Sequence, residues 1–128
     1  MAKEFNHLDD LQQQMRTAVG GLLRKAAFDT QAGAQSRVKV QTGNLKNSIY
    51  VVTADHSAPP GGIRDAVDEG ISASDELEVY VAVAAAYGLY VEMGTSRAPA
   101  QPYLRPAFDA VRPSLIAALQ SLEDRLKR

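Results

Sequence analysis

Residues 76–83 read Glu-Leu-Glu-Val-Tyr-Val-Ala-Val, so that every second side chain from Leu77 to Val83 is a large apolar one. In an extended chain these side chains fall on one face, which is the pattern of a half-buried β-strand. A second stretch, Ile-Tyr-Val-Val-Thr at 49–53, is rich in β-branched and aromatic residues and predicts another strand. We expect the two strands to pair antiparallel as a hairpin with a long loop.

Helical periodicity flanks these strands on both sides. Apolar residues recur every three or four positions from Leu8 to Ala26 and again from Leu104 to Leu126. Gly20-Gly21 predicts a bend or a close approach of neighbouring chain, because glycine costs about 1 kcal/mol in a helix. Pro113 lacks a backbone donor and is expected to kink the second helix or restart it.

Together these patterns predict one α+β domain over residues 1–128, a length that suits a single domain. We expect a long N-terminal helix, a small mainly antiparallel sheet with a long acidic hairpin loop, and a C-terminal helix packed on the sheet. The expected segments are an N-terminal helix at 1–36, a sheet region at 37–94 with its loop at 55–75, a proline-rich connection at 95–102 and a C-terminal helix at 103–128.

Charge is balanced overall but not along the chain. With 14 Lys+Arg against 15 Asp+Glu, the formal net charge of -1 excludes the overall basic balance of many DNA-binding proteins. Residues 1–54 carry seven basic and four acidic residues, residues 55–78 one and seven, and residues 97–128 six and three. The middle segment is either an ordinary solvated loop or an acidic surface past which a polyanion moves without sticking.

The chemistry-bearing residues predict neither an enzyme nor a cofactor. The chain has no cysteine, and its histidines, His7 and His56, lack a second ligand at metal-binding spacing. Asp55, His56 and Ser57 are adjacent and cannot converge as a catalytic triad. No stretch approaches the roughly 18 apolar residues of a membrane span, and the N-terminus lacks the apolar run of a signal peptide.

Two stretches resemble the signature of small head–tail junction proteins of long-tailed bacteriophages, which include neck, tail-completion and tail-terminator proteins and also occur in gene transfer agents. One is Thr-Gly-Asn-Leu-Lys-Asn-Ser-Ile at 42–49. The other is Tyr-Val-Glu-Met-Gly-Thr at 90–95 followed by Pro-Ala-Gln-Pro-Tyr-Leu-Arg-Pro-Ala at 99–107.

The resemblance implies a virion structural protein that forms a ring of six subunits at the head–tail junction. Such a ring caps the tail tube and joins it to the head connector. Its implied partners are further copies of itself, the tail-tube protein, a head-completion or connector protein, and DNA that passes through a central channel without specific binding. Two alternatives stay open: a neck or connector-side position, and a small nucleic-acid-binding module.

The resemblance, together with the preference of tyrosine and arginine for interfaces, also gives candidate site residues. Expected at a subunit, tail or head interface are Tyr87, Tyr90, Glu92, Gly94, Thr95, Arg97, Pro99, Pro102, Tyr103 and Arg105. Expected to hold the motifs are Thr42, Gly43, Leu45 and Pro106. Expected to line the channel are Asp65, Asp68, Glu69 and Asp75, although this loop could instead dock the tail tube or connector. Glu92 is expected to pair with Arg105 or Arg97, either within one subunit or between subunits. Alternatively, residues 94–106 simply join a strand to the last helix.

Overall fold

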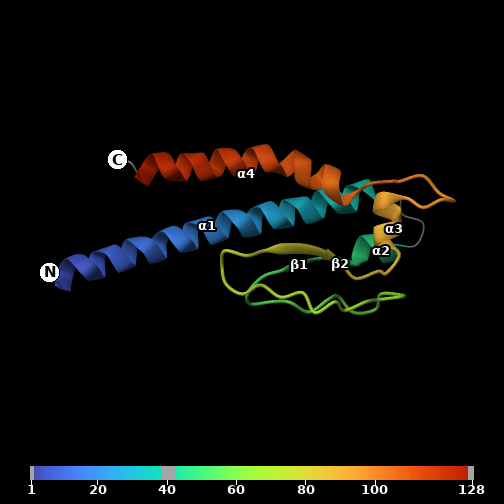
Figure 1. Cartoon of the computed structure of the whole chain (residues 1–128), viewed down its shortest axis with the longest axis horizontal. Coiled ribbons are helices and arrows are strands. Elements are labelled where there is room, and N and C mark those ends of the chain that lie inside the picture. The colour runs from blue at the N-terminus through green and yellow to red at the C-terminus, as the bar shows by residue number, and fades with distance from the viewer. Residues whose placement is uncertain (1, 39–42, 127–128) are drawn as a thin grey trace.

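The computed structural model describes residues 2–38 and 43–126 and places them in layers (Figure 1). Helix α4 lies along α1, α1 lies against a two-stranded sheet, and the long connection between the strands covers the far side of that sheet. The elements are α1 (Ala2–Arg37), α2 (Asn44–Asn47), β1 (Ile49–Val52), β2 (Tyr80–Val83), α3 (Gly88–Met93) and α4 (Leu104–Leu126). The predicted α+β class is therefore confirmed.

The C-terminal helix differs from the prediction in what it packs on. Its main contacts are with α1 and not with the sheet. Small residues allow this close packing: Ala34 and Ala107 are buried, and a Cβ added at Gly33 would lie 3.3 Å from the Cβ of Ala107. A two-stranded sheet is too narrow for two long helices to pack on it, so α1 packs on the sheet and α4 packs on α1.

Of the two reasons predicted for Gly20-Gly21, a bend or a close approach, the structure shows the close approach, and neither long helix is interrupted. Helix α1 runs unbroken through Gly20-Gly21, and the reason for glycine is a close approach from the same chain. A Cβ at position 20 would lie 2.9 Å from the backbone oxygen of Glu76. Helix α4 likewise continues through Pro113 without restarting.

The strands pair antiparallel, with Ile49 opposite Val83 and Val52 opposite Tyr80. Strand β2 is shorter than predicted, because residues 75–78 form a turn in which the Asp75 carboxylate accepts the N–H of Leu77 at 2.8 Å. The predicted apolar face of β2 packs on the core through Val81 and Val83, but the opposite face is covered as well, since the most buried residue of the strand is Ala82.

Both faces of the sheet are covered, which explains why Ala82 is buried. One face packs on the helices, and the other packs on residues of the long connection, where Ile63 and Ile71 contact the cluster containing Tyr50 and Val52. Backbone bonds extend this cover, with the N–H of Val67 donating to the oxygen of Ala84 at 2.7 Å. The acidic segment is therefore a packed layer of the domain.

Candidate functional site

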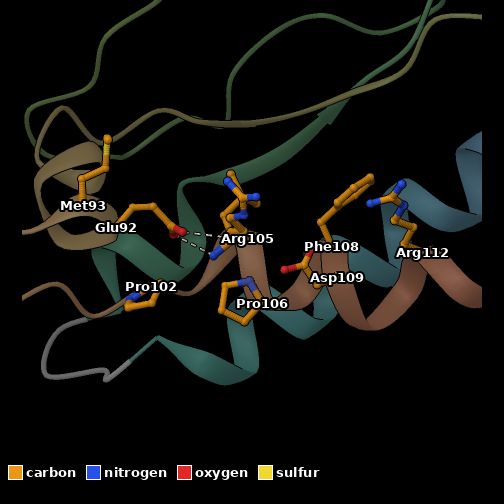
Figure 2. A pocket seen from close by; sticks show the side chains of 9 residues that line it. Glu92, Met93, Pro102, Arg105, Pro106, Phe108, Asp109 and Arg112 are labelled. Atoms are coloured by element: carbon orange, nitrogen blue, oxygen red, sulfur yellow. Dashed lines mark hydrogen bonds between the residues drawn. The ribbon is translucent and has the colours of Figure 1, made fainter.

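The carboxylate of Glu92, on α3, caps the first turn of α4 (Figure 2). Its Oε1 accepts the backbone N–H groups of Tyr103 at 2.9 Å and Leu104 at 2.8 Å, and its Oε2 accepts that of Arg105 at 3.2 Å. The first amides of a helix have no partner within the helix, and the positive end of the helix dipole favours a negative charge. Glu92 supplies both an acceptor and a charge from another helix.

The predicted pairing of Glu92 with Arg105 or Arg97 is not formed within the described residues of one chain, and pairing between subunits stays a prediction. In the described part of the chain no ion pair joins Glu92 to either guanidinium group. Glu92 instead accepts a hydrogen bond from the backbone N–H of Arg105, because its oxygens are aligned with the amides at the start of α4.

Tyr103 also holds α3 against the start of α4, through a buried side chain. Its side chain is buried, and its hydroxyl donates to the backbone oxygen of Gly88 at 3.0 Å. Burial, then the charge of Glu92 and the neighbouring Tyr87, raise the pKa of Tyr103 to about 12. At Gly88 a Cβ would lie 2.6 Å from Cγ1 of Val83 and 2.8 Å from the Tyr103 hydroxyl. Both ends of α3 are thus fixed against α4.

The connection from α3 to α4 is a closed turn. Gly94 has a φ of 80°, and a Cβ there would lie 2.7 Å from the backbone nitrogen of Ala100. The Thr95 hydroxyl accepts the N–H groups of Arg97 and Ala98, and the N–H of Gln101 donates to the oxygen of Val91 at 2.8 Å. The turn presents the exposed residues Arg97, Pro99 and Pro102 to solvent.

The outer face of this junction is apolar. Leu89 and Tyr90 are each 61% exposed, and Met93 is 71% exposed. Beside them lies a groove of about 860 Å³ between α3 and α4, with apolar walls that include Met93 and Phe108 (Figure 2). Arg105 and Arg112 also line this groove. Such large exposed apolar side chains on one rigid element are typical of a protein–protein contact.

The motif at 42–49 holds the other side of α3. Thr42 lies outside the described residues. Gly43 has a φ of 77° and precedes α2, while Leu45 is buried in the core shared with Tyr103. Pro106 lies in the first turn of α4, where its missing N–H costs nothing.

Asn44 connects three parts of the chain and was not singled out in the sequence. Its Nδ2 donates to the Tyr87 hydroxyl at 2.9 Å and to the backbone oxygen of Arg64 at 3.1 Å. Its Oδ1 accepts the N–H of Arg64 at 2.8 Å. The sequence feature that could have drawn attention to Asn44 is its position between Gly43 and the apolar Leu45. The half-buried Tyr87, expected at an interface, has its hydroxyl bonded inside the domain.

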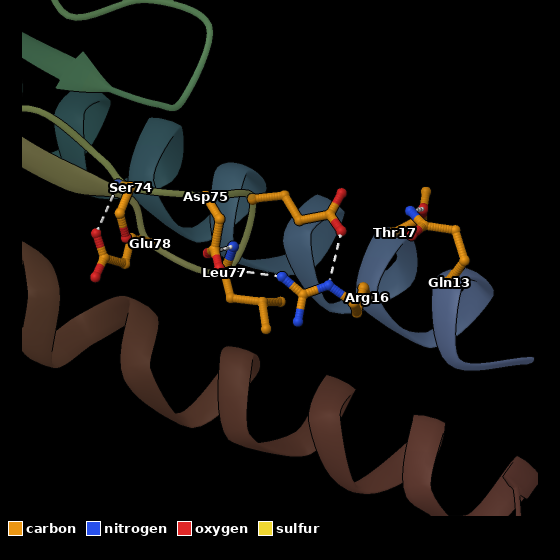
Figure 3. Close-up of polar contacts among 8 residues, drawn as sticks. Gln13, Arg16, Thr17, Ser74, Asp75, Leu77 and Glu78 are labelled. Carbon is orange, nitrogen blue, oxygen red and sulfur yellow. Dashed lines mark hydrogen bonds and ion pairs between the residues drawn. The ribbon is translucent and has the colours of Figure 1, made fainter. Parts of the chain in front are cut away.

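The four acidic residues expected in the channel fall in two places. Asp65, Asp68 and Glu69 are exposed on the outer layer, where Asp65 has a φ of 56°. Asp75 instead lies against α1, with its Oδ2 3.1 Å from Nη2 of Arg16 (Figure 3). The hydrogen bond from the Leu77 N–H, then Arg16, lower the pKa of Asp75. Lining of a channel stays a prediction.

Within residues 2–38 and 43–126 no group of three or more histidine, aspartate or glutamate side chains could hold a metal ion. No helix in that part of the chain is long and apolar enough to cross a bilayer.

Comparison with known proteins gives one family. A family model described as "Bacteriophage HK97-gp10, putative tail-component" matches residues 5–94, which is most of the chain. The match includes the motif at 42–49 and helix α3, but ends before the proline-rich stretch at 99–107. No curated protein and no solved structure matches.

Proposed function

Because the chain belongs to the HK97-gp10-like family of bacteriophage tail components, we propose that it is a structural, non-catalytic protein that forms a ring of six copies at the head–tail junction. The ring caps the end of the tail tube and joins it to the head connector, leaving a central channel through which DNA passes. As a tail component it belongs to the virion and contacts other virion proteins.

The observation that supports this proposal best is the rigid apolar face of α3. Leu89 and Tyr90 are large and each 61% exposed. Burying a side chain of this kind contributes roughly 1.5–3 kcal/mol. The bonds of Glu92, Tyr103 and Gln101 hold α3 against α4. This face therefore presents a preformed surface to a partner, and we assign it to the contact with the tail tube.

The shape of the molecule also suits a ring. A closed ring of identical subunits needs two different surfaces on each copy, which meet in turn around the axis. The chain offers two unlike outer layers, α4 on one side and the acidic connection on the other (Figure 1).

Capping of tail tubes tests this function. Tubes assembled from the tail-tube protein of the same phage are mixed with the purified chain, and capped ends are counted by electron microscopy. The wild-type chain is expected to cap the tubes and stop their growth. Leu89→Ser combined with Tyr90→Ser is expected to abolish capping, while Phe28→Ser, which changes an exposed aromatic residue of α1, retains it. Tubes that grow unchanged with the wild-type chain, or equal capping by all three proteins, would contradict the proposal.

A further inference from the structure

The groove between α3 and α4 combines apolar walls with two arginines and two carboxylates. Met93, Pro102 and Phe108 line it, and Phe108 is 47% exposed. Arg105 and Arg112 lie about two turns apart on α4 and line the same groove (Figure 2).

Two carboxylates, those of Glu92 and Asp109, also line the groove, and their negative charges oppose the positive charges of the two arginines. The oxygens of Glu92 are already occupied by three backbone amides. Asp109 lies four residues after Arg105 and three before Arg112, within reach of both on the helix surface. The lining is formally neutral. The amides at the start of α4 offset the charge of Glu92, and no ion pair joins Asp109 to either arginine in the described part of the chain, so both guanidinium groups are available to an anionic occupant with an apolar centre.

Residues 65–69 on the opposite layer have the complementary chemistry. The stretch reads Asp-Ala-Val-Asp-Glu, which places an exposed valine among three carboxylates. Val67 is 40% exposed and is therefore accessible to a partner. A surface valine with negative charge on both sides matches an apolar groove flanked by arginines.

The backbone of this stretch is already fixed. The N–H of Ala86 donates to the oxygen of Asp65 at 2.9 Å, and the N–H of Val67 donates to the oxygen of Ala84 at 2.7 Å. Ala66 also bridges Ala85 as in a short antiparallel strand. Little conformational freedom remains to be lost on binding, which favours association.

We propose that residues 65–69 of one copy dock in the α3–α4 groove of the next copy, with Val67 between Met93 and Phe108 and its flanking carboxylates beside Arg105 and Arg112. Within one copy residues 65–67 are held by backbone bonds to Ala84 and Ala86, whereas the groove lies between α3 and α4, so we assign the contact to different copies. It uses two different surfaces and can therefore close a ring. The inference rests on the proposed ring. It assigns Asp65, Asp68 and Glu69 to this contact and not to the channel wall.

Disulfide trapping tests the contact directly, because the chain has no cysteine of its own. Val67→Cys chains are mixed with Phe108→Cys chains under mild oxidation, and the products are identified by mass spectrometry. The mixed dimer is expected to form in large excess over that from Val67→Cys with Phe28→Cys, in which the second cysteine replaces another exposed phenylalanine.

Charge exchange provides the second arm. Asp65→Lys with Asp68→Lys, and separately Arg105→Glu with Arg112→Glu, are each expected to weaken self-association on the order of tenfold or more. The chain carrying all four changes is expected to recover it, because the charges are complementary again. Circular dichroism checks that each variant is folded.

The results separate the contact from the ring. If the chain forms rings but the Val67–Phe108 disulfide does not form, the contact is overturned and the ring proposal stands. The same holds if the chain forms rings but the variant with all four charge changes does not recover self-association. Residues 65–69 would then be free to line the channel or to meet another virion protein. A chain that neither associates nor forms the mixed disulfide would contradict both proposals.

Discussion

The backbone N–H of Tyr103 donates to Oε1 of Glu92 at 2.9 Å, and this bond joins the start of α4 to α3. The Tyr103 hydroxyl returns to α3 by donating to the backbone oxygen of Gly88. One residue is thus bonded to both ends of a six-residue helix, which is too short to be stable alone. The orientation of the exposed α3 face depends on these two bonds.

Removing the Glu92 carboxylate should therefore destabilise the domain. Glu92→Ala leaves three amides of α4 without their acceptor and is expected to lower the free energy of unfolding by roughly 1–3 kcal/mol. Glu92→Gln keeps one side-chain oxygen and is expected to lose less. Urea denaturation measures both. Glu69→Gln, at an exposed glutamate, is the matched control with an expected change within about 0.5 kcal/mol. A Glu92→Ala variant as stable as this control would refute the capping role.

Replacement of glycine by alanine is expected to destabilise the fold at Gly88 but not at Gly61. A Cβ at Gly88 would overlap Val83 and the Tyr103 hydroxyl, so Gly88→Ala is expected to destabilise the fold by about 1–3 kcal/mol. Gly61 has nothing within 4 Å of the added Cβ, and Gly61→Ala is expected to be neutral or slightly stabilising. Thermal denaturation of the two variants, measured side by side, distinguishes them. Equal melting temperatures would show that α3 does not sit as closely on β2 as described.

Asn44 should control how the acidic layer attaches to the rest of the domain. Asn44→Ala removes the bonds to Tyr87 and to both backbone groups of Arg64, and is expected to cost about 2–3 kcal/mol. Hydrogen exchange of the Arg64 amide should accelerate more than that of amides within α1. Asn44→Asp retains the acceptor for the Arg64 N–H and should protect that amide better than alanine does. Uniform acceleration throughout the chain would argue against a local role.

The buried Tyr103 predicts a loss of stability at alkaline pH. Its pKa is about 12 in the folded protein, whereas tyrosine in an unfolded chain has a pKa near 10. Below pH 10 both states keep the proton and the contribution is complete. Between pH 10 and 12 the unfolded chain releases the proton first, so the free energy of unfolding falls.

Tyr103→Phe isolates this effect from other titrating groups. The variant loses the bond to Gly88 and is expected to be about 1 kcal/mol less stable at neutral pH. The stability difference between wild type and variant should shrink as the pH rises from 10 to 12. A difference that stays constant over this range would show that the phenol is not shielded from solvent.

The strands and long helices were predictable because their signals are local. The β-branched and aromatic residues at 49–53 and the three-to-four spacing before Ala26 and after Leu104 each specify one element without reference to the rest of the chain. The start of β2 was not predictable. It depends on Asp75, whose carboxylate forms a turn with Leu77 while its other oxygen binds Arg16, 59 residues away.

The candidate site was predictable in its residues but not in its contacts. Glu92 stood out as a single carboxylate among prolines and arginines, and a guanidinium group is the usual partner to expect for it. The actual partners are amides that become available only where α4 begins. The packing of Ile63 and Ile71 on the sheet was not predictable from their isolated positions in the acidic loop. It depends on a sheet face that the two long helices leave uncovered.

Mass measurement of the purified wild-type chain under native conditions shows whether the chain forms a closed ring. We expect a single species of six copies, seen as rings with a central opening by electron microscopy of the same sample. A chain that stays monomeric at every concentration tested, or that forms an open series of sizes without a preferred one, would contradict it.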